Sequence, residues 1–149
     1  MREDLEPNDA GVTFETVREF DGTAGSIAAA RALATAFLSG QRDGRGRRLP
    51  PQVVVDVQLV VSELVTNAVK YAPGPCTLSL LLRGRYLEVS VADSAPEPPI
   101  PLTTEPGRVG RHGLEIVLAL CVSFEFQHAG GGKFITVLVD LDAAAEAAS

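Results

Sequence analysis

VVVDVQLVVSELVTNAVKYA, from Val53 to Ala72, has the length and composition of a long helix. It is long enough for about five helical turns and contains no Gly or Pro, the residues that destabilise helix interiors most. Pro50 and Pro51 precede it, as is typical of a helix start, and Pro73-Gly74-Pro75 ends it. At 100° per residue, its apolar side chains form one wide face. That face contains Val57, Val60, Val61, Leu64, Val65, Ala68, Val69 and Ala72.

A polar stripe runs along one edge of that apolar face. It contains Asp56, Glu63, Asn67 and Lys70, which follow one another at intervals of seven, four and three residues. A carboxylate and a carboxamide one turn apart, beside a buried surface, are suited to a metal or phosphate site. A solvated edge of an ordinary amphipathic helix has the same pattern, and the spacing alone favours this second interpretation.

The composition indicates a single globular domain. The chain has 149 residues, 46% of them hydrophobic, and can bury most of its apolar surface. Its formal net charge of −6 argues against nucleic acid as the main partner, because phosphate binding needs clustered Lys and Arg. One basic cluster, RDGRGRR at 42–48, is interrupted by glycine. We interpret it as a solvated loop, with a docking patch for an acidic protein surface as the alternative.

The cysteines and the hydrophobic pattern bear on the cellular compartment. Cys76 and Cys121 are too few and too far apart for a zinc site or a disulfide framework, so we expect free thiols in a reducing cytosol. The polar N-terminus has no signal-peptide pattern, and no apolar run approaches the ~20 residues that a membrane span needs. We therefore expect a cytoplasmic protein that does not contact the membrane.

The rest of the chain predicts five strands and two further helices. Strands are expected at 12–20, 76–82, 86–92, 122–128 and 134–141, mostly because apolar and polar residues alternate there. Helices are expected at 24–38 and 113–120. The segment 94–108 contains five prolines and cannot be regular structure. It is either a lid or binding loop, or a structural spacer.

This order of elements predicts an α+β fold, a two-layer α/β sandwich. A mixed, mostly antiparallel sheet of about five strands would carry three helices on one face. We expect the domain to span residues 12–141, with a flexible N-terminal tail at 1–11 and a frayed C-terminal tail at 142–149.

Four motifs in a fixed order carry a resemblance to a known family. They are SELVTNAVKYA at 62–72, VADSAPEPP at 91–99, GRHGLEIVLAL at 110–120 and GGGKFITVLV at 130–139. Together they resemble the ATP-binding domain shared by histidine kinases, type II topoisomerases, heat-shock chaperones and mismatch-repair ATPases. The closer resemblance is to its small stand-alone members, actinobacterial anti-sigma factors that are also serine-protein kinases. It covers residues 12–141.

The resemblance implies roles for five residues. Asn67 resembles the asparagine that holds Mg²⁺ against the nucleotide phosphates, and Glu63 resembles the carboxylate that acts as general base. Asp93 resembles the aspartate that accepts a hydrogen bond from the adenine amino group. Gly110 and Gly113 resemble the glycines whose backbone lets the lid and the next helix wrap the phosphates.

The sequence departs from the family pattern in three places. Asp93 is followed by SAPEP, without the glycines of the usual DxGxG, as in the actinobacterial subgroup. Arg111-His112 stands where close relatives often carry another glycine pair. In the last hairpin Gly132 is followed by Lys133 rather than Thr, and Thr136 is the nearest candidate to replace it.

The resemblance also implies a function. ATP and Mg²⁺ would be the ligands, and the protein would be a serine/threonine kinase that holds a sigma factor inactive and phosphorylates an anti-sigma factor antagonist. A homodimer would form through the first strand and the Ala-rich helix. One alternative is a catalytically degenerate ATP-binding module that sequesters a partner without phosphoryl transfer. The ATPase part of a sensor histidine kinase fits less well, since the sequence shows no phosphoacceptor helix pair and no membrane segment.

Overall fold

The computed structural model describes residues 13–42, 46–71, 74–93, 111–129 and 132–148. Five strands form one sheet in the order β1-β2-β3-β5-β4, and every neighbouring pair is antiparallel. The strands are β1 (Thr13–Phe20), β2 (Cys76–Arg83), β3 (Tyr86–Asp93), β4 (Ser123–Ala129) and β5 (Gly132–Asp140). The helices within these ranges are α1 (Gly25–Ser39), α2 (Pro51–Tyr71), α3 (Arg111–Leu120) and α4 (Leu141–Ala148).

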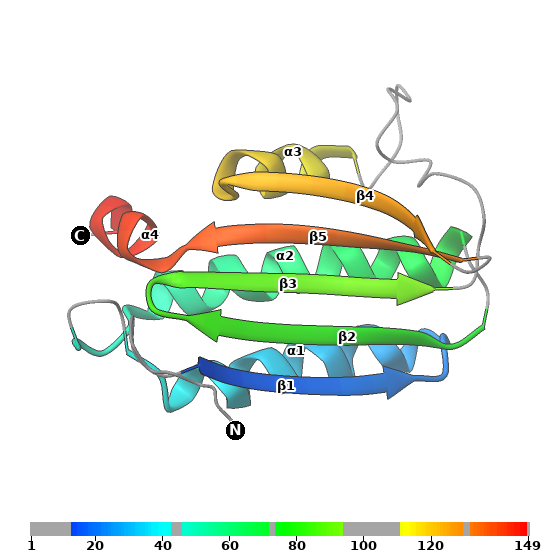
Figure 1. Cartoon of the computed structure of the whole chain (residues 1–149), viewed down its shortest axis with the longest axis horizontal. Helices are drawn as coiled ribbons and strands as arrows, with labels where there is room; N and C mark the ends of the chain where they lie inside the picture. The colour runs from blue at the N-terminus through cyan, green and yellow to red at the C-terminus, as the bar shows by residue number, and fades with distance from the viewer. Residues whose placement is uncertain (1–12, 43–45, 72–73, 94–110, 130–131, 149) are drawn as a thin grey trace.

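The helices α1, α2 and α3 form a layer on one face of the sheet (Figure 1). α2 crosses behind β3 and β5, and α1 packs against α2. The predicted two-layer α+β sandwich is therefore confirmed. The sequence predicted a mixed, mostly antiparallel sheet, and every pairing in it is antiparallel. Hairpins join β2 to β3 and β4 to β5, which makes these two pairs antiparallel.

α2 supplies the centre of the core. It begins at Pro51, two residues before the predicted Val53, because a proline is tolerated in the first turn of a helix. Six residues of its predicted apolar face expose 2% or less of their surface: Val57, Val60, Val61, Leu64, Val65 and Ala68. The inward side chains of β2 and β3 are buried in the same core, among them Leu78, Leu80, Leu87 and Val89. Burial of this apolar surface is the main term that stabilises the domain.

By length and composition alone, α2 also qualifies as a membrane span. The 20-residue run Pro51–Lys70 contains an 18-residue window with a mean hydropathy of 1.3. The expectation that no apolar run approaches this length was therefore wrong. In the fold, α1 and the sheet cover the apolar face of this helix.

The C-terminal segment is helical rather than frayed. α4 begins directly after Asp140, whose Oδ1 accepts hydrogen bonds from the backbone N–H groups of Asp142 at 3.0 Å and Ala143 at 3.2 Å. An aspartate at this position caps the otherwise unpaired N–H groups of a helix start. Leu141 anchors the helix, since its side chain is completely buried. The prediction of a frayed tail was wrong for these residues. The Asp140 cap and the buried Leu141 side chain stabilise α4 only once the sheet has formed.

Arg85, in the turn between β2 and β3, holds this cap in place. Its Nε and Nη2 donate hydrogen bonds to the two Asp140 carboxylate oxygens at 2.9 and 2.7 Å. The bonds from Arg85 are the main reason why the pKa of Asp140 lies below its ordinary value of 3.8. Since the folded-state pKa is lowered, the stabilisation is present above that ordinary value and is lost as the pH falls through the folded-state pKa.

We expect Asp140→Asn to lower the melting temperature at neutral pH by a few degrees, because asparagine keeps the helix cap but loses the ion pair with Arg85. The difference from the unsubstituted protein should shrink as the pH is lowered from about 7 to about 3. Thermal unfolding followed by circular dichroism measures both values. Asp56→Asn on the surface of α2 is the control. A difference that stays constant with pH contradicts the role assigned to Asp140.

The turn after β1 requires glycine at position 22. Gly22 has a φ of +86°, and a Cβ atom there would lie only 1.9 Å from the carbonyl oxygen of Gly74. The turn is fixed by Asp21, whose Oδ1 accepts hydrogen bonds from the Thr23 backbone at 2.9 Å and the Ser26 hydroxyl at 3.1 Å. The start of α1 and the segment after α2 are therefore in direct backbone contact.

Gly22→Ala should lower the free energy of unfolding by about 2–4 kcal/mol, because the methyl group meets backbone atoms that cannot move independently. Gly46→Ala is the matched control, since Gly46 has a φ of +80° but no atom within 4 Å of an added Cβ. It should cost only about 1–2 kcal/mol, from the backbone conformation alone. Urea denaturation measures both changes. Equal costs would show that the contact with Gly74 is not tight.

Candidate functional site

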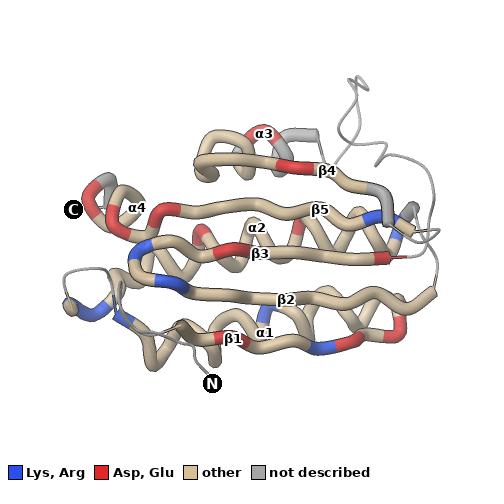
Figure 2. The backbone as a smooth tube through the Cα atoms, in the orientation of Figure 1, with Lys and Arg blue, Asp and Glu red and all other residues tan. Residues whose placement is uncertain are grey.

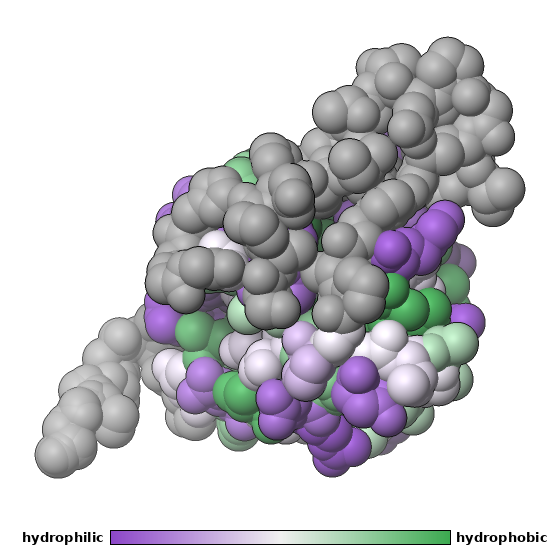
Figure 3. Space-filling view, turned by 90° about the vertical axis from the view of Figure 1, so that its right-hand side faces the viewer, coloured by the Kyte–Doolittle hydropathy of each residue, from purple (hydrophilic) through white to green (hydrophobic). Residues whose placement is uncertain are grey.

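Three element ends meet at one edge of the sandwich. The C-terminal end of α2, the end of β3 and the start of β5 lie together at the right of Figure 1. Figure 2 shows an acidic end of β3 beside a basic start of β5. Seen from this edge, the described surface mixes hydrophilic and hydrophobic residues (Figure 3). The end of α2 that carries Asn67 and the end of β3 that carries Asp93 therefore lie at the same edge.

The polar stripe of α2 changes in burial along its length. Asn67 exposes only 6% of its surface, Glu63 and Asp56 are partly buried, and Lys70 is exposed. Asp56 accepts a hydrogen bond from Gln52 Nε2 at 2.8 Å, an ordinary pairing one turn apart on a helix surface. The solvated-edge interpretation thus holds at the ends of the stripe and not at Asn67.

The amide of Asn67 is buried without a partner. Among the residues that the structure describes, no group accepts a hydrogen bond from its Nδ2. Leaving such a group unpaired costs about 1–3 kcal/mol, and the great majority of buried polar groups are paired. A carboxamide can donate to a phosphate oxygen or present its own oxygen to Mg²⁺. The unpaired nitrogen therefore fits a phosphate oxygen, and the oxygen of the same carboxamide is the atom that would hold Mg²⁺.

We expect Asn67→Leu to leave the free energy of unfolding unchanged or to raise it by about 1 kcal/mol. Leucine has a similar size and removes the unpaired amide. Urea denaturation without nucleotide is the measurement. Asn67→Ala is the comparison, because it leaves a cavity and should destabilise the protein. A clear loss of stability in the leucine variant would show that the amide has a structural partner.

The remaining predicted site residues are placed in part. Glu63 lies one turn before Asn67 on the same helix. Gly113 lies in the first turn of α3, which packs against α2. Gly110 and the predicted lid at 94–108 lie outside the described residues. Within the described part of the chain, no group of three or more His, Cys, Asp or Glu side chains comes together as a metal site would.

Asp93 ends β3, as predicted, and forms a buried ion pair with Lys133. Lys133 Nζ donates to both carboxylate oxygens, at 2.8 and 2.9 Å, and each side chain exposes only 3% of its surface. The two residues are direct cross-strand partners in the register of β3 and β5. Lys133 departs from the family pattern in sequence, but its pairing with Asp93 was not predicted. The alternation of the two strands could have revealed it, since both residues fall on the inward face.

Thr136 does not take the place of the missing threonine. Its Oγ1 lies 3.0 Å from Ser90 Oγ, in a cross-strand pair on the outer face of the sheet. Lys133 is an odd number of positions away along β5 and so points to the opposite face, toward the helices. Thr136 therefore does not substitute for a threonine at position 133.

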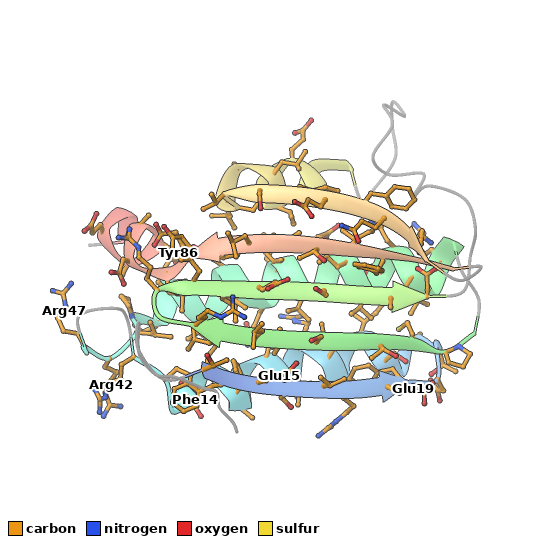
Figure 4. All side chains as sticks on the ribbon, in the orientation of Figure 1. Phe14, Glu15, Glu19, Arg42, Arg47 and Tyr86 are labelled. Atoms are coloured by element: carbon orange, nitrogen blue, oxygen red, sulfur yellow. The ribbon has the colours of Figure 1, made fainter. Side chains whose placement is uncertain are left out.

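A shallow pocket on the outer face of the sheet is unrelated to these residues. Its volume is about 160 Å³, and it is lined by Leu81, Arg83, Tyr86, Glu88 and Leu138. Tyr86 begins β3 and lies near the opposite edge in Figure 4, whereas Asp93 ends the strand. Seven residues of extended chain separate the two by roughly 23 Å. None of the residues predicted for the site lines this pocket.

Both cysteines are free thiols, as predicted. Burial is the main cause that raises the pKa of Cys76, to which the charge of Asp93 adds, and burial also raises the pKa of Cys121. A raised pKa keeps a thiol protonated and poorly nucleophilic at neutral pH. The cysteines are therefore part of the packing, not of the candidate site.

A family model for the histidine kinase-like ATPase domain matches residues 20–139. The chain belongs to the histidine kinase-like ATPase family. The matched range includes α2, β3, α3 and β5, which carry all the motifs of the resemblance. ATP is accordingly the ligand that the family description implies for the site.

Solved structures share the fold. The RsbU and RsbW domains of Rv1364c from Mycobacterium tuberculosis match with a TM-score of 0.61 and 21% identity, over 85% of this chain and 32% of that chain. The histidine kinase domain of a blue-light activated kinase from Erythrobacter litoralis matches with a TM-score of 0.53 and 19% identity, over 82% and 62%. This chain thus spans less than two thirds of either. No curated protein sequence matches the chain.

Proposed function

We propose that this ATPase-family chain is an anti-sigma factor and a protein serine/threonine kinase. The observation that carries the proposal is the buried Asn67 amide without a partner among the described residues. It lies one turn from Glu63, toward the end of α2 that meets the edge where Asp93 ends β3. The resemblance of the chain to actinobacterial anti-sigma kinases and the RsbW domain in a structure of the same fold support the choice of partner class.

In this proposal the nucleotide lies across the edge formed by α2, β3 and α3. Asn67 holds the phosphates and Mg²⁺, whose charge would offset that of the transferred phosphoryl group. Asp93 accepts a hydrogen bond from the amino group of the base. Gly110 and Gly113 allow the backbone before and within the start of α3 to approach the phosphates, because unpaired N–H groups at a helix start favour an anion.

Glu63 accepts the proton of the attacking serine or threonine hydroxyl. The hydroxyl oxygen forms a bond to the γ-phosphorus while the bond to the bridging oxygen breaks, and ADP leaves with that electron pair. A partly buried carboxylate one turn from Asn67 is a suitable proton acceptor in this proposal.

The proposed partners are a sigma factor, which the protein holds inactive, and the antagonist protein that it phosphorylates. We propose a homodimer contact on β1 and α1, because β1 is an edge strand with Phe14 and Val17 exposed by 44% and 56% (Phe14 is labelled in Figure 4). The net charge of −6 favours protein partners over nucleic acid. The proposed compartment is the cytoplasm, without membrane contact.

A second candidate function is a nucleotide-binding module that sequesters its partner without phosphoryl transfer. The departure from the family pattern at Lys133, which pairs with Asp93, favours it, because efficient turnover needs a nucleotide that is held well. Both candidates share the same site on α2, and they differ only in the chemistry at Glu63.

Incubation with labelled ATP, Mg²⁺ and candidate antagonist proteins tests the kinase proposal. The unsubstituted protein should transfer label to a serine or threonine. Glu63→Gln should keep Mg²⁺-dependent ATP binding, measured by calorimetry, but lower the transfer rate by about 10²–10⁴-fold, because the proton acceptor is gone. Asn67→Ala should lose ATP binding, and Asp56→Asn on the same helix should change neither.

The outcomes separate the two candidates. ATP binding without any label transfer favours the sequestering module. An Asn67→Ala variant that binds ATP as well as the unsubstituted protein contradicts the site itself. Transfer that is unaffected in Glu63→Gln removes the role of Glu63 and leaves the site in place.

A further inference from the structure

The ion pair of Asp93 and Lys133 lies where the proposed function places the base of the nucleotide. We propose that Lys133 is a latch on this site: its ammonium group competes with the amino group of the base for the Asp93 carboxylate and so lowers the affinity for ATP. The inference rests on the proposed function, since it requires a nucleotide that binds at Asp93.

The geometry of the pair leaves little room for a second donor. A single Nζ contacts both carboxylate oxygens, at 2.8 and 2.9 Å, and therefore lies between them. It engages the lone pairs that the two oxygens direct toward each other. Another group could then approach only from the outer sides of the two oxygens. An amino group that approaches the open end of the carboxylate meets the ammonium group first.

The strength of the contact makes it a true competitor. Both donors would use the ionised carboxylate, but Lys133 adds the attraction of a full positive charge, whereas the amino group of adenine is neutral. Each side chain of the pair exposes only 3% of its surface, so water does little to weaken the attraction. A nucleotide must therefore separate Lys133 from at least one oxygen of Asp93, or accept a poorer contact.

The fold holds the latch in place. Asp93 and Lys133 are opposite each other in the antiparallel register, and the next pair on the same inward face, Val91 and Ile135, is 98% buried. This register holds Lys133 against Asp93, next to buried apolar side chains on the same face. Threonine, which the family often has at this position, carries no charge and is too short to span both oxygens.

Calorimetric titration of ATP and Mg²⁺ into Lys133→Thr tests the latch. We expect ATP to bind at least about tenfold more tightly than in the unsubstituted protein, because no ammonium group has to leave the carboxylate. Arg83→Thr is the charge control: it removes one positive charge from the exposed end of β2, far from Asp93, and should leave the affinity unchanged.

A second measurement uses the unsubstituted protein, in case the threonine variant does not fold around the uncompensated Asp93 charge. Lys133 and Lys70 are the two lysines of the chain, so ¹⁵N-lysine labelling gives two ammonium groups to follow by NMR. The buried Lys133 signal should shift as ATP and Mg²⁺ are added, in step with the calorimetric binding curve. An unchanged Lys133 signal at saturating ATP overturns the latch.

The possible failures can be told apart. Binding by the unsubstituted protein that is unchanged or weaker in a folded Lys133→Thr variant overturns the latch alone and leaves the proposed function standing. Absence of ATP binding in both folded proteins overturns the proposed function and the latch together.

Discussion

The packing of α2 against the sheet is the constraint on which the site depends. Leu64, Val65 and Ala68 are all buried, and this fixes the rotation of the helix about its axis. Around the helix, Asn67 lies about 60° from Leu64, so it is carried to the edge of the buried face and cannot turn out to solvent without exposing that face. The unpaired amide at this position is therefore a consequence of hydrophobic packing. The apolar face provides the stability, and it tolerates the cost of one unpaired polar group.

The antiparallel register of β3 and β5 places the second half of the site. A shift of one residue would move Asp93 and Lys133 from the inward to the outward face, because strand side chains alternate. The inward positions before them are filled by buried apolar side chains, which prevents such a shift. The sheet thus keeps two opposite charges in contact at the end of the proposed site, and each charge needs the other to remain buried.

The sequence predicted most of the fold because most of it depends on local periodicity. All five strands and the first three helices lie within two residues of their predicted bounds. α4 was missed because its start depends on Asp140, and Asp140 is held by Arg85 from another turn. For the site, the spacing of the α2 stripe alone favoured a solvated edge, which suits Lys70 and not the buried Asn67. The ion pair with Lys133 was not predicted, since it exists only once the strands are in register.

The central proposal is a nucleotide site at the α2 edge, with Asn67 at its metal and phosphate end. A crystal structure with a non-hydrolysable ATP analogue and Mg²⁺ tests this most directly. We expect the amide of Asn67, which lies one turn from Glu63, to contact the metal ion or a phosphate oxygen, and the base to lie beside Asp93. A nucleotide bound elsewhere, or an Asn67 amide that contacts neither phosphate nor metal in the complex, would contradict it.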